Sequence, residues 1–379
     1  MDLDSLTLTQ ALIRFDTINP PGNERPCAEF LARPLGEAGY DISLHDYGPD
    51  RSNLVARLSA SAKPGSSSKP PLCFSGHIDT VPLGQAAWTR PPFGGEVDNG
   101  RLFGRGASDM KSGVAALILA ALRLAKLERR ASDVLLIITA GEESGCTGAA
   151  YLAEQPGLLG KAGALVVAEP TSNQPLVGHK GALWLRAKTA GVTAHGSMPE
   201  RGVNAVFKAA QAIVKLGSYA FDVPGHPVMG APSLNVGTVL GGMNVNSVPD
   251  SAEIGIDIRT VAGQDNRAVL GHLQAYLGDE VGLEPFVDVG SVYSDPDEPW
   301  LRQVFAVVEA LLGQQTTVQT APYFTDASVL TPALGHPPTV ILGPGEPSMA
   351  HQTDEYCFVD KIAEAVEAYT RIGSSWLRD

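Results

Sequence analysis

Histidines and carboxylates recur in this chain directly after short apolar runs. These groups are His77 and Asp79 after Leu72–Ser75, Glu142 and Glu143 after Val134–Thr139, and Glu169 after Ala164–Ala168. Open α/β sheets build their sites at the carboxyl ends of their strands, so we expect these side chains to meet at one edge. Imidazole and carboxylate ligands together favour zinc, with cobalt or manganese as substitutes.

The pair His77 and Asp79 has a spacing that suits a metal ligand and its supporting group. Residues two apart project to the same side of an extended strand. One imidazole nitrogen can then bind a metal while the carboxylate orients the ring. Taken alone, a His-X-Asp sequence is weak evidence for a metal site and is more typical of a surface turn.

Glu142 and Glu143 are adjacent carboxylates that follow a strongly apolar run. Two such groups at the mouth of a sheet repel each other, and burying them is costly without a cation. One of them can bind a metal while its neighbour takes a proton from an activated water. A solvated acidic turn is the alternative for this pair in isolation.

The glycine-rich stretch 104–113 carries Asp109 just before an apolar segment, Ser112–Leu127, with helical length. Its order of residues fits neither the phosphate-loop pattern nor the dinucleotide fingerprint. Asp109 is therefore either a helix cap or a metal ligand. His351 follows a second glycine-rich stretch, 343–345, and supplies a further imidazole.

The elements that must position these groups alternate between strand and helix in both outer parts of the chain. Nearly continuous apolar strands separated by helices predict a mostly parallel sheet with helices on both faces. The predicted strands are Asn53–Leu58, Leu72–Ser75, Val134–Thr139, Ala164–Ala168 and Thr339–Leu342, the predicted helices are Ser112–Leu127 and Leu301–Leu312, and Ser59–Pro71 is a predicted loop.

The pattern changes near Gly178, where alternating and helical segments follow one another in the order β-α-β-β-α-β. That order predicts a ferredoxin-like α+β layer inserted into the larger domain. We expect a catalytic domain at 1–177 and 291–379 and an inserted domain at 178–290. The inserted strands and helices are predicted at Ala182–Thr189, Asn204–Leu216, Ser233–Leu240, Ala252–Arg259, Arg267–Leu277 and near Phe286.

Composition narrows the class of partner. The chain has 379 residues, and 41 acidic against 28 basic residues give a formal net charge of −13, which disfavours nucleic acid and anionic membranes. The amino-terminal stretch lacks the pattern of a signal peptide, and no apolar run is long enough to span a bilayer. The four cysteines are scattered, as expected of thiols in a reducing compartment, so a cytoplasmic location is predicted.

Nine stretches distributed over the whole chain share a resemblance to one family. They are GHIDTVP, GRGASDMKSG, GEES, AEPTSNQP, HKG, AHGSMPERGVNA, GGMNVNSVP, DIR and LGPGEPSMAHQTDEY. The chain resembles the acetylornithine deacetylase / succinyl-diaminopimelate desuccinylase / aminoacylase-carboxypeptidase family, and most of all its acetylornithine deacetylase branch. It departs from the desuccinylase branch at His179 and at Pro322–Ser328. The resemblance implies a zinc-exopeptidase-like catalytic domain and an inserted domain that serves as lid and dimer contact.

The resemblance also implies a role for each residue of a two-zinc centre. Asp109 would bridge the ions, one of which would also bind His77 and Glu169, and the other Glu143 and His351. Glu142 would be the general base for a water that the two ions activate, and Asp79 would orient His77. In relatives the counterpart of His195 reaches the site of a partner subunit, so a homodimer is implied. Asn246 and Arg259 match positions that bind the substrate carboxylate, and Thr325, Asp326 and Gly345 would face the same cleft.

These observations predict a hydrolase that cleaves the amide bond of a small N-acyl amino acid. A dipeptidase or glutamate-releasing carboxypeptidase on the same scaffold is the first alternative. A metal-binding or ligand-sensing protein without catalysis is the second, and it would be favoured by loss of the base, whereas Glu142 is present. A nucleotide enzyme would need a Gly-Lys-Ser/Thr motif that the chain lacks.

Overall fold

The computed structural model describes residues 4–61 and 69–378, so the middle of the predicted loop Ser59–Pro71 lies outside the described residues. Contacts divide the chain into two compact units. The first contains the described residues up to Gly178, together with Tyr293–Thr320 and the chain from Thr325 onward. The second is His179–Val292 with Ala321–Phe324.

A six-stranded sheet forms the centre of the first unit, in the order β1-β2-β6-β3-β7-β14. Strands β6, β3, β7 and β14 are mutually parallel, and β2 runs antiparallel to both of its neighbours. The mostly parallel sheet predicted from the apolar runs is therefore confirmed. The strands are β1 (Asp41–Gly48), β2 (Arg51–Leu58), β3 (Leu72–His77), β6 (Val134–Thr139), β7 (Ala164–Val167) and β14 (Thr339–Ile341).

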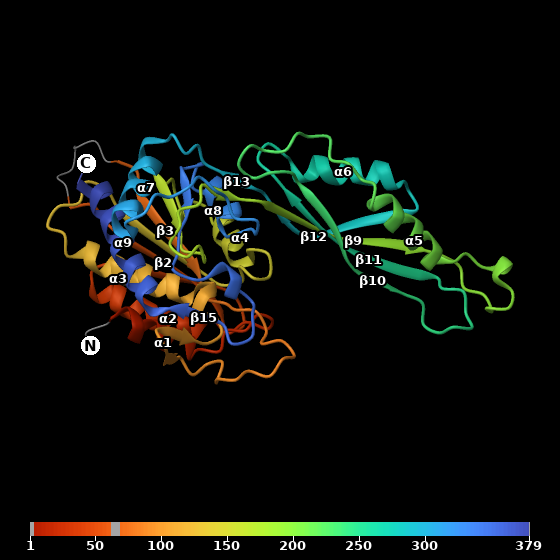
Figure 1. The fold of residues 1–379 in the computed structure, drawn as a ribbon, viewed down its shortest axis with the longest axis horizontal. Coiled ribbons are helices and arrows are strands. Elements are labelled where there is room, and N and C mark those ends of the chain that lie inside the picture. The colour runs from red at the N-terminus through yellow and green to blue at the C-terminus, as the bar shows by residue number, and fades with distance from the viewer. Residues whose placement is uncertain (1–3, 62–68, 379) are drawn as a thin grey trace. The chain divides into compact units, whose positions relative to one another are not determined.

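Helices cover both faces of this sheet (Figure 1). Helix α2 packs on β1 and β2, and α3 packs on β3 and against α1 and α9, while α4 contacts α8 from the other side. Helix α3 is buried over almost its whole length because sheet and helices surround it, which explains its unbroken apolar sequence. The helices are α1 (Ser5–Ile13), α2 (Arg25–Glu37), α3 (Ser112–Ala125), α4 (Thr147–Ala153), α7 (Pro299–Leu312), α8 (Ala327–Ala333) and α9 (Val359–Arg378).

Two smaller sheets and two of three short helical turns complete the first unit and its links to the insertion. Strands β4 (Glu96–Asp98), β5 (Arg101–Phe103) and β15 (Tyr356–Phe358) form an antiparallel sheet in the order β15-β5-β4, and β8 (Gly178–His179) pairs with β13 (Val292–Tyr293). The turns are η1 (Ala107–Lys111), η2 (Pro199–Arg201) and η3 (Pro347–Met349), of which η2 belongs to the second unit. Strand β15 joins residues near the carboxyl end to the loop that carries Asp109.

The second unit has the predicted order β-α-β-β-α-β. Its antiparallel sheet runs β10-β11-β9-β12, and alternate residues of β11 are buried against the two helices. This alternation is expected of a sheet with one face on a core and one face in water. The elements are β9 (Gly181–Ala190), α5 (Ala205–Leu216), β10 (Ser233–Gly241), β11 (Ser251–Thr260), α6 (Asn266–Leu277) and β12 (Val281–Val289).

The segment Ala321–Phe324 corrects the predicted division at one point, because the sequence placed it in the larger domain. Lys180 N donates to Ala321 O at 3.0 Å, and the rings of Trp184 and Phe324 lie 5.8 Å apart, edge to face. These contacts attach the segment to the second unit. A segment of four residues that leaves the first unit and returns to it is too short to change the local composition, so the sequence does not indicate it.

Two further predictions concern membrane-spanning segments and the four cysteines. No helix among the described residues is long and apolar enough to cross a membrane. Cys27, Cys73, Cys146 and Cys357 are all buried and free.

Candidate metal centre

The carboxyl ends of three neighbouring strands bring the predicted ligands to one edge of the large sheet. The parallel register pairs His77 with Thr139 and Ser75 with Val167, so β3 and β6 end level with each other and β7 ends two residues earlier. Their following residues therefore emerge side by side, as expected for a parallel sheet. All ligands predicted for the two ions lie in the first unit.

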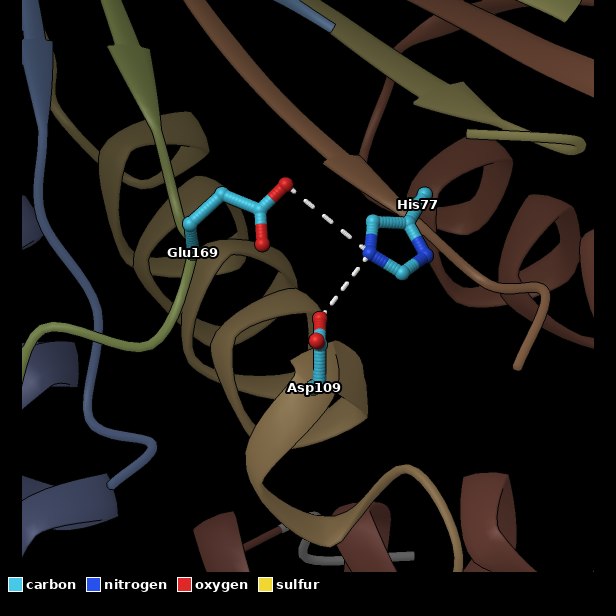
Figure 2. Close-up of side chains that lie close together, drawn as sticks. All are labelled: His77, Asp109 and Glu169. Carbon is cyan, nitrogen blue, oxygen red and sulfur yellow. Dashed lines mark hydrogen bonds and ion pairs between the residues drawn. The ribbon is translucent and has the colours of Figure 1, made fainter. Parts of the chain in front are cut away.

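The first cluster consists of His77, Asp109 and Glu169 (Figure 2). His77 Nε2 lies 3.2 Å from Asp109 Oδ1 and 3.8 Å from Glu169 Oε1. The side chains of His77 and Glu169 are only 1% and 5% exposed. Figure 2 shows the three side chains converging from a strand end, a helix start and the loop after β7. We call this cluster the inner position.

The second cluster, the outer position, consists of Asp109, Glu143 and His351. His351 Nε2 lies 3.1 Å from Glu143 Oε2 and 3.5 Å from Asp109 Oδ2. The two oxygens of Asp109 thus face different histidines. The ligand atoms within each cluster lie within 4.8 Å of one another, and Asp109 belongs to both. The structure therefore brings together all five residues that the resemblance implied as ligands.

Asp79 supports His77 through its backbone as well as its side chain. His77 Nδ1 lies 3.0 Å from Asp79 O and 3.4 Å from Asp79 Oδ1, so the carbonyl is the closer partner. The carboxylate accepts the backbone N–H groups of Glu142 at 3.1 Å and Glu143 at 3.2 Å. Asn19 Nδ2 donates to the same carboxylate at 2.9 Å. Asp79 thereby fixes the histidine and both glutamates in one hydrogen-bonded group.

The glycine-rich loop 104–109 surrounds a carboxylate that sequence reasoning missed. Glu355 is fully buried and accepts the backbone N–H groups of Gly106, Ser108 and Asp109 at 2.8–2.9 Å. Convergent backbone N–H groups of this kind bind anions, and here an internal carboxylate occupies them. Glu355 stands in the quoted stretch LGPGEPSMAHQTDEY. Only its chain position directly before β15, which pairs with β5 beside this loop, could have indicated its role.

Two basic residues near the loop have structural partners. Arg105 Nη1 lies 2.7 Å from Glu355 Oε2, and both side chains are buried. Lys111 Nζ donates to Phe15 O at 2.8 Å. The contacts of both residues are therefore structural.

Three glycines let the loops around the site approach one another closely. A Cβ at Gly113 would lie 2.1 Å from Ala168 O, and one at Gly343 would lie 2.2 Å from the same oxygen. A Cβ at Gly345 would lie 2.1 Å from Ser108 O. Gly345, predicted to face substrate, is thus required where its loop packs on the residue preceding Asp109.

Several buried carboxylates lie around the proposed base, Glu142. Burial raises the pKa of Glu142 well above its usual value, and the carboxylates of Glu169 and Glu143 raise it further. Burial likewise raises the pKa of Glu143 to about 7, with a contribution from Asp109. Among the described residues, Glu143 Oε1 is buried without a hydrogen-bond partner.

The histidines respond to the same charges. Burial alone would lower the pKa of His77, but the carboxylates of Glu169, Asp109 and Asp79 raise it well above its usual value. Hydrogen bonds to Asp109 and Glu143 raise the pKa of His351 to about 10. Excess acid groups, one with an unpartnered buried oxygen, together with two convergent imidazoles, fit a pair of divalent cations.

A second group of side chains lies behind Glu142. Thr139 donates a short hydrogen bond to Asp326 Oδ2, and Cys146 Sγ lies 4.0 Å from Glu142 Oε1. Burial raises the pKa of Asp326 to about 6. Thr325 is fully buried and its hydroxyl accepts the N–H of Ala327 at 3.1 Å, at the start of α8. Its predicted contact with substrate stays a prediction.

His195 and Asn246 lie in the second unit, on adjacent exposed segments. Gly196 N donates to Asn246 O at 2.7 Å, which places the two segments side by side. His195 Nδ1 receives the backbone N–H of Ser197 at 3.2 Å and lies 2.7 Å from its hydroxyl. Because Nδ1 accepts, the neutral ring carries its proton on Nε2. His195 therefore presents an outward N–H donor.

Arg259 is held in place by its own strand. Its Nε and Nη2 bind the two oxygens of Asp257 at 2.9 and 3.1 Å, and its Cζ lies 5.7 Å from the centre of the Trp184 ring. Nη1 makes no hydrogen bond within the described part of the chain. The contact of Arg259 with a substrate carboxylate stays a prediction.

Two histidine–carboxylate clusters sharing one aspartate, at the carboxyl edge of an α/β sheet, define a two-metal hydrolase. The chain belongs to the peptidase family M20/M25/M40, whose model matches residues 73–374. It is thus a metal-dependent amidohydrolase or peptidase, and the family resemblance read from the sequence is confirmed.

Similar proteins cover the chain from end to end. A probable succinyl-diaminopimelate desuccinylase of Staphylococcus epidermidis is 29% identical over 99% of this chain and 98% of its own. An M20 family metallo-carboxypeptidase of Sulfolobus solfataricus has a similar structure, with a TM-score of 0.81, 19% identity and 99% of each chain covered. A dinuclear metal-binding M20 peptidase of Bacillus subtilis gives a TM-score of 0.71 at 18% identity, covering 99% of this chain and 98% of its own.

Proposed function

We propose that this protein hydrolyses the amide bond of a small N-acyl amino acid, in the manner of an acetylornithine deacetylase. The observation that carries the proposal is the pair of clusters sharing Asp109, with Glu142 beside them. A non-catalytic metal protein has no need of a buried glutamate beside its ligands that is not itself a ligand.

Zinc is the metal that we propose, with cobalt or manganese as substitutes, because both clusters combine imidazole with carboxylate oxygen. His77, Asp109 and Glu169 would hold one ion, and Asp109, Glu143 and His351 the other. Divalent cations held there would supply Lewis-acid chemistry, which polarises an amide carbonyl and lowers the pKa of a water.

Glu142 acts as the general base and acid. Its carboxylate is buried beside the proposed ligands, so it can accept a proton and return it within the site. It takes a proton from the attacking water and returns it to the nitrogen of the departing amine. Asp79 holds the backbone of Glu142 in place during both transfers.

The second unit supplies groups suited to the substrate. His195 offers an N–H donor for the developing negative charge on the carbonyl oxygen, and Arg259 offers a guanidinium edge for the substrate carboxylate. Asn246 stands beside His195 on the adjacent segment. In this proposal the unit serves as lid and dimer contact.

An exposed apolar surface supports a homodimer through this unit. Phe207 and Val214 on α5 are 68% and 74% exposed, and Leu240 on β10 is 69% exposed. Strand β10 is also an edge of its sheet. Exposed apolar residues beside an unpaired strand edge are a recurrent setting for association.

The choice of substrate rests on the relatives by sequence. The one reported above is named for removing an acyl group from an amino acid, whereas the peptidases match at below 25% identity and share the fold. The departures at His179 and Pro322–Ser328 favour an acetyl over a succinyl group. The free, buried thiols support a cytoplasmic location.

A substrate panel tests the proposal. Amine release would be measured from N-acetylornithine, other N-acetyl amino acids, N-succinyl-diaminopimelate and dipeptides, with zinc-loaded and chelated protein side by side. Zinc-dependent release from N-acetyl substrates is the expected result. Release from dipeptides alone would move the protein to the peptidase alternative, and release from the succinyl substrate alone would overturn the choice of acyl group.

A further inference from the structure

A buried ion pair connects the two loops that carry Asp109 and His351. Arg105 Nη1 and Glu355 Oε2 lie 2.7 Å apart, and the side chains are 1% and 0% exposed. Burying two charges is costly unless the pair has good geometry and further hydrogen bonds to both side chains. The remaining hydrogen bonds of Arg105 and Glu355 show which loops the two side chains bind.

Glu355 holds the loop of the bridging aspartate. Its Oε1 accepts the N–H groups of Ser108 at 2.8 Å and of Asp109 at 2.9 Å, and its Oε2 accepts that of Gly106 at 2.9 Å. The backbone of Asp109 is thus fixed by a carboxylate 246 residues away in sequence.

Arg105 holds the loop of the outer histidine. Its Nη1 also donates to Gln352 O at 3.3 Å, directly after His351, and its Nη2 donates to Pro82 O at 3.1 Å. The ring of Trp88 lies 5.1 Å from its Cζ. His351 has a positive φ of 63°, a conformation that a residue with a side chain keeps only when its surroundings hold it.

We infer that Arg105 and Glu355 form a positioning pair that sets the separation of Asp109 and His351 and so closes the outer metal position. Neither side chain is among the proposed ligands, so both act through the residues they hold. The inference rests on the two-metal function proposed above. The inner position needs this pair less, because His77 and Glu169 follow central strands of the sheet.

The substitution Glu355→Gln separates charge from shape. The amide keeps the size of the side chain. Its NH₂ group, however, would face backbone N–H groups that donate hydrogen bonds to the carboxylate in the wild-type protein. The loop around Asp109 then has to shift. Loss of a group that supports a ligand lowers metal affinity by roughly 10–100-fold.

Manganese alone is a suitable probe, because two Mn²⁺ ions sharing a carboxylate give an exchange-coupled electron paramagnetic resonance spectrum. Wild-type protein should bind two Mn²⁺ per chain and show the coupled spectrum. The Glu355→Gln variant should still bind one Mn²⁺ ion tightly, but its affinity for the second ion should fall by about 10–100-fold. With two equivalents of Mn²⁺ added, the variant should therefore lack the coupled spectrum.

Asp133→Asn is the matched control. It removes one charge from the half-buried Arg57–Asp133 pair, directly before β6 at the end of the sheet away from the ligands. It should bind both ions as wild type does. If Glu355→Gln does not fold, Arg105→Lys carries the test, since lysine keeps the charge but loses the fork that reaches Gln352 and Pro82.

Wild-type affinities and a wild-type coupled spectrum in a folded Glu355→Gln or Arg105→Lys variant would overturn the positioning role. A wild-type protein with no coupled spectrum at saturation would instead overturn the two-metal centre itself. The two failures are therefore distinguishable.

Discussion

The inner and outer metal positions share Asp109 and use the same kinds of ligand, yet they differ in their surroundings. The side chain of His77 is 1% exposed, whereas that of His351 is 53% exposed. His77 ends a central strand of the sheet, and His351 stands in a loop with a positive φ. The inner ligands His77 and Glu169 are therefore part of the core, while the outer position depends on His351, an exposed loop residue.

This difference in burial leads us to expect different metal binding at the inner and outer positions. An ion at the inner position is enclosed by residues that fold with the sheet, so we expect it to bind tightly and exchange slowly. An ion at the outer position faces solvent through His351 and is expected to exchange more readily and to lie closer to entering substrate. Glu142 is adjacent in sequence to Glu143 of the outer cluster.

The largest expected effect concerns the base. Glu142→Gln keeps the size of the side chain but removes the proton acceptor, so kcat should fall by about 10²–10⁴-fold. Metal content, measured by elemental analysis, should stay at the wild-type value because Glu142 is not a proposed ligand. A variant with near-normal kcat and full metal would show that another group is the base.

The next effect compares the two positions directly through matched substitutions. His351→Ala should release one ion and leave the other bound, with little change in folding. His77→Ala should lose the inner ion and also lower the melting temperature, because it removes a buried group that balances Glu169 and Asp109. The measurements are metal equivalents after desalting and thermal unfolding. Equal metal loss and equal melting temperatures in both variants would contradict the distinction.

A smaller effect is the pH dependence of stability. In the metal-free protein the pKa of Glu143 is raised from 4.5 to about 7 and that of His351 from 6.5 to about 10. Both groups bind protons more tightly when folded, so their stabilising contribution is complete at low pH and is lost as pH rises through these values. The lowered pKa of Asp109 acts in the opposite sense, but only below about pH 4.

The stabilisation by added Mn²⁺, taken as the difference in urea midpoint between loaded and metal-free protein, should therefore grow from pH 5 to pH 8. Other titrating groups cancel in this difference. A difference that stays constant or shrinks over the range would show that protons and metal do not compete for these ligands.

The smallest effect concerns Thr325, whose hydroxyl is bonded to Ala327 N. Thr325→Ala should lower the free energy of unfolding by about 1 kcal/mol through loss of that hydrogen bond. KM should change by less than about twofold. A tenfold rise in KM with unchanged stability would instead favour the substrate contact predicted from the sequence.

Much of this arrangement could be predicted from the sequence because its signals are local. Apolar runs such as Val134–Thr139 define the central strands, and their ends identify Glu142, Glu143 and Glu169 as neighbours. Strand β1 was not predicted, because it lies at the edge of the sheet with exposed and half-buried residues that give no apolar run.

What the sequence could not indicate depends on contacts between distant residues. Asp354 and Glu355 are adjacent acids, yet Asp354 binds Thr89 near the surface and Glu355 is buried among backbone N–H groups. Nothing in their local pattern distinguishes them. Thr325 likewise stands next to Asp326 in a polar stretch, and only the packing of α8 shows that it is buried.

Activity as a function of metal equivalents tests the central claim most directly. Metal-free protein would be titrated with zinc, and amine release from N-acetylornithine would be recorded at each step under otherwise constant conditions. We expect no release without metal and a rise that reaches its plateau as the second equivalent binds. Release that persists in fully chelated protein would contradict a two-metal centre as the source of the activity.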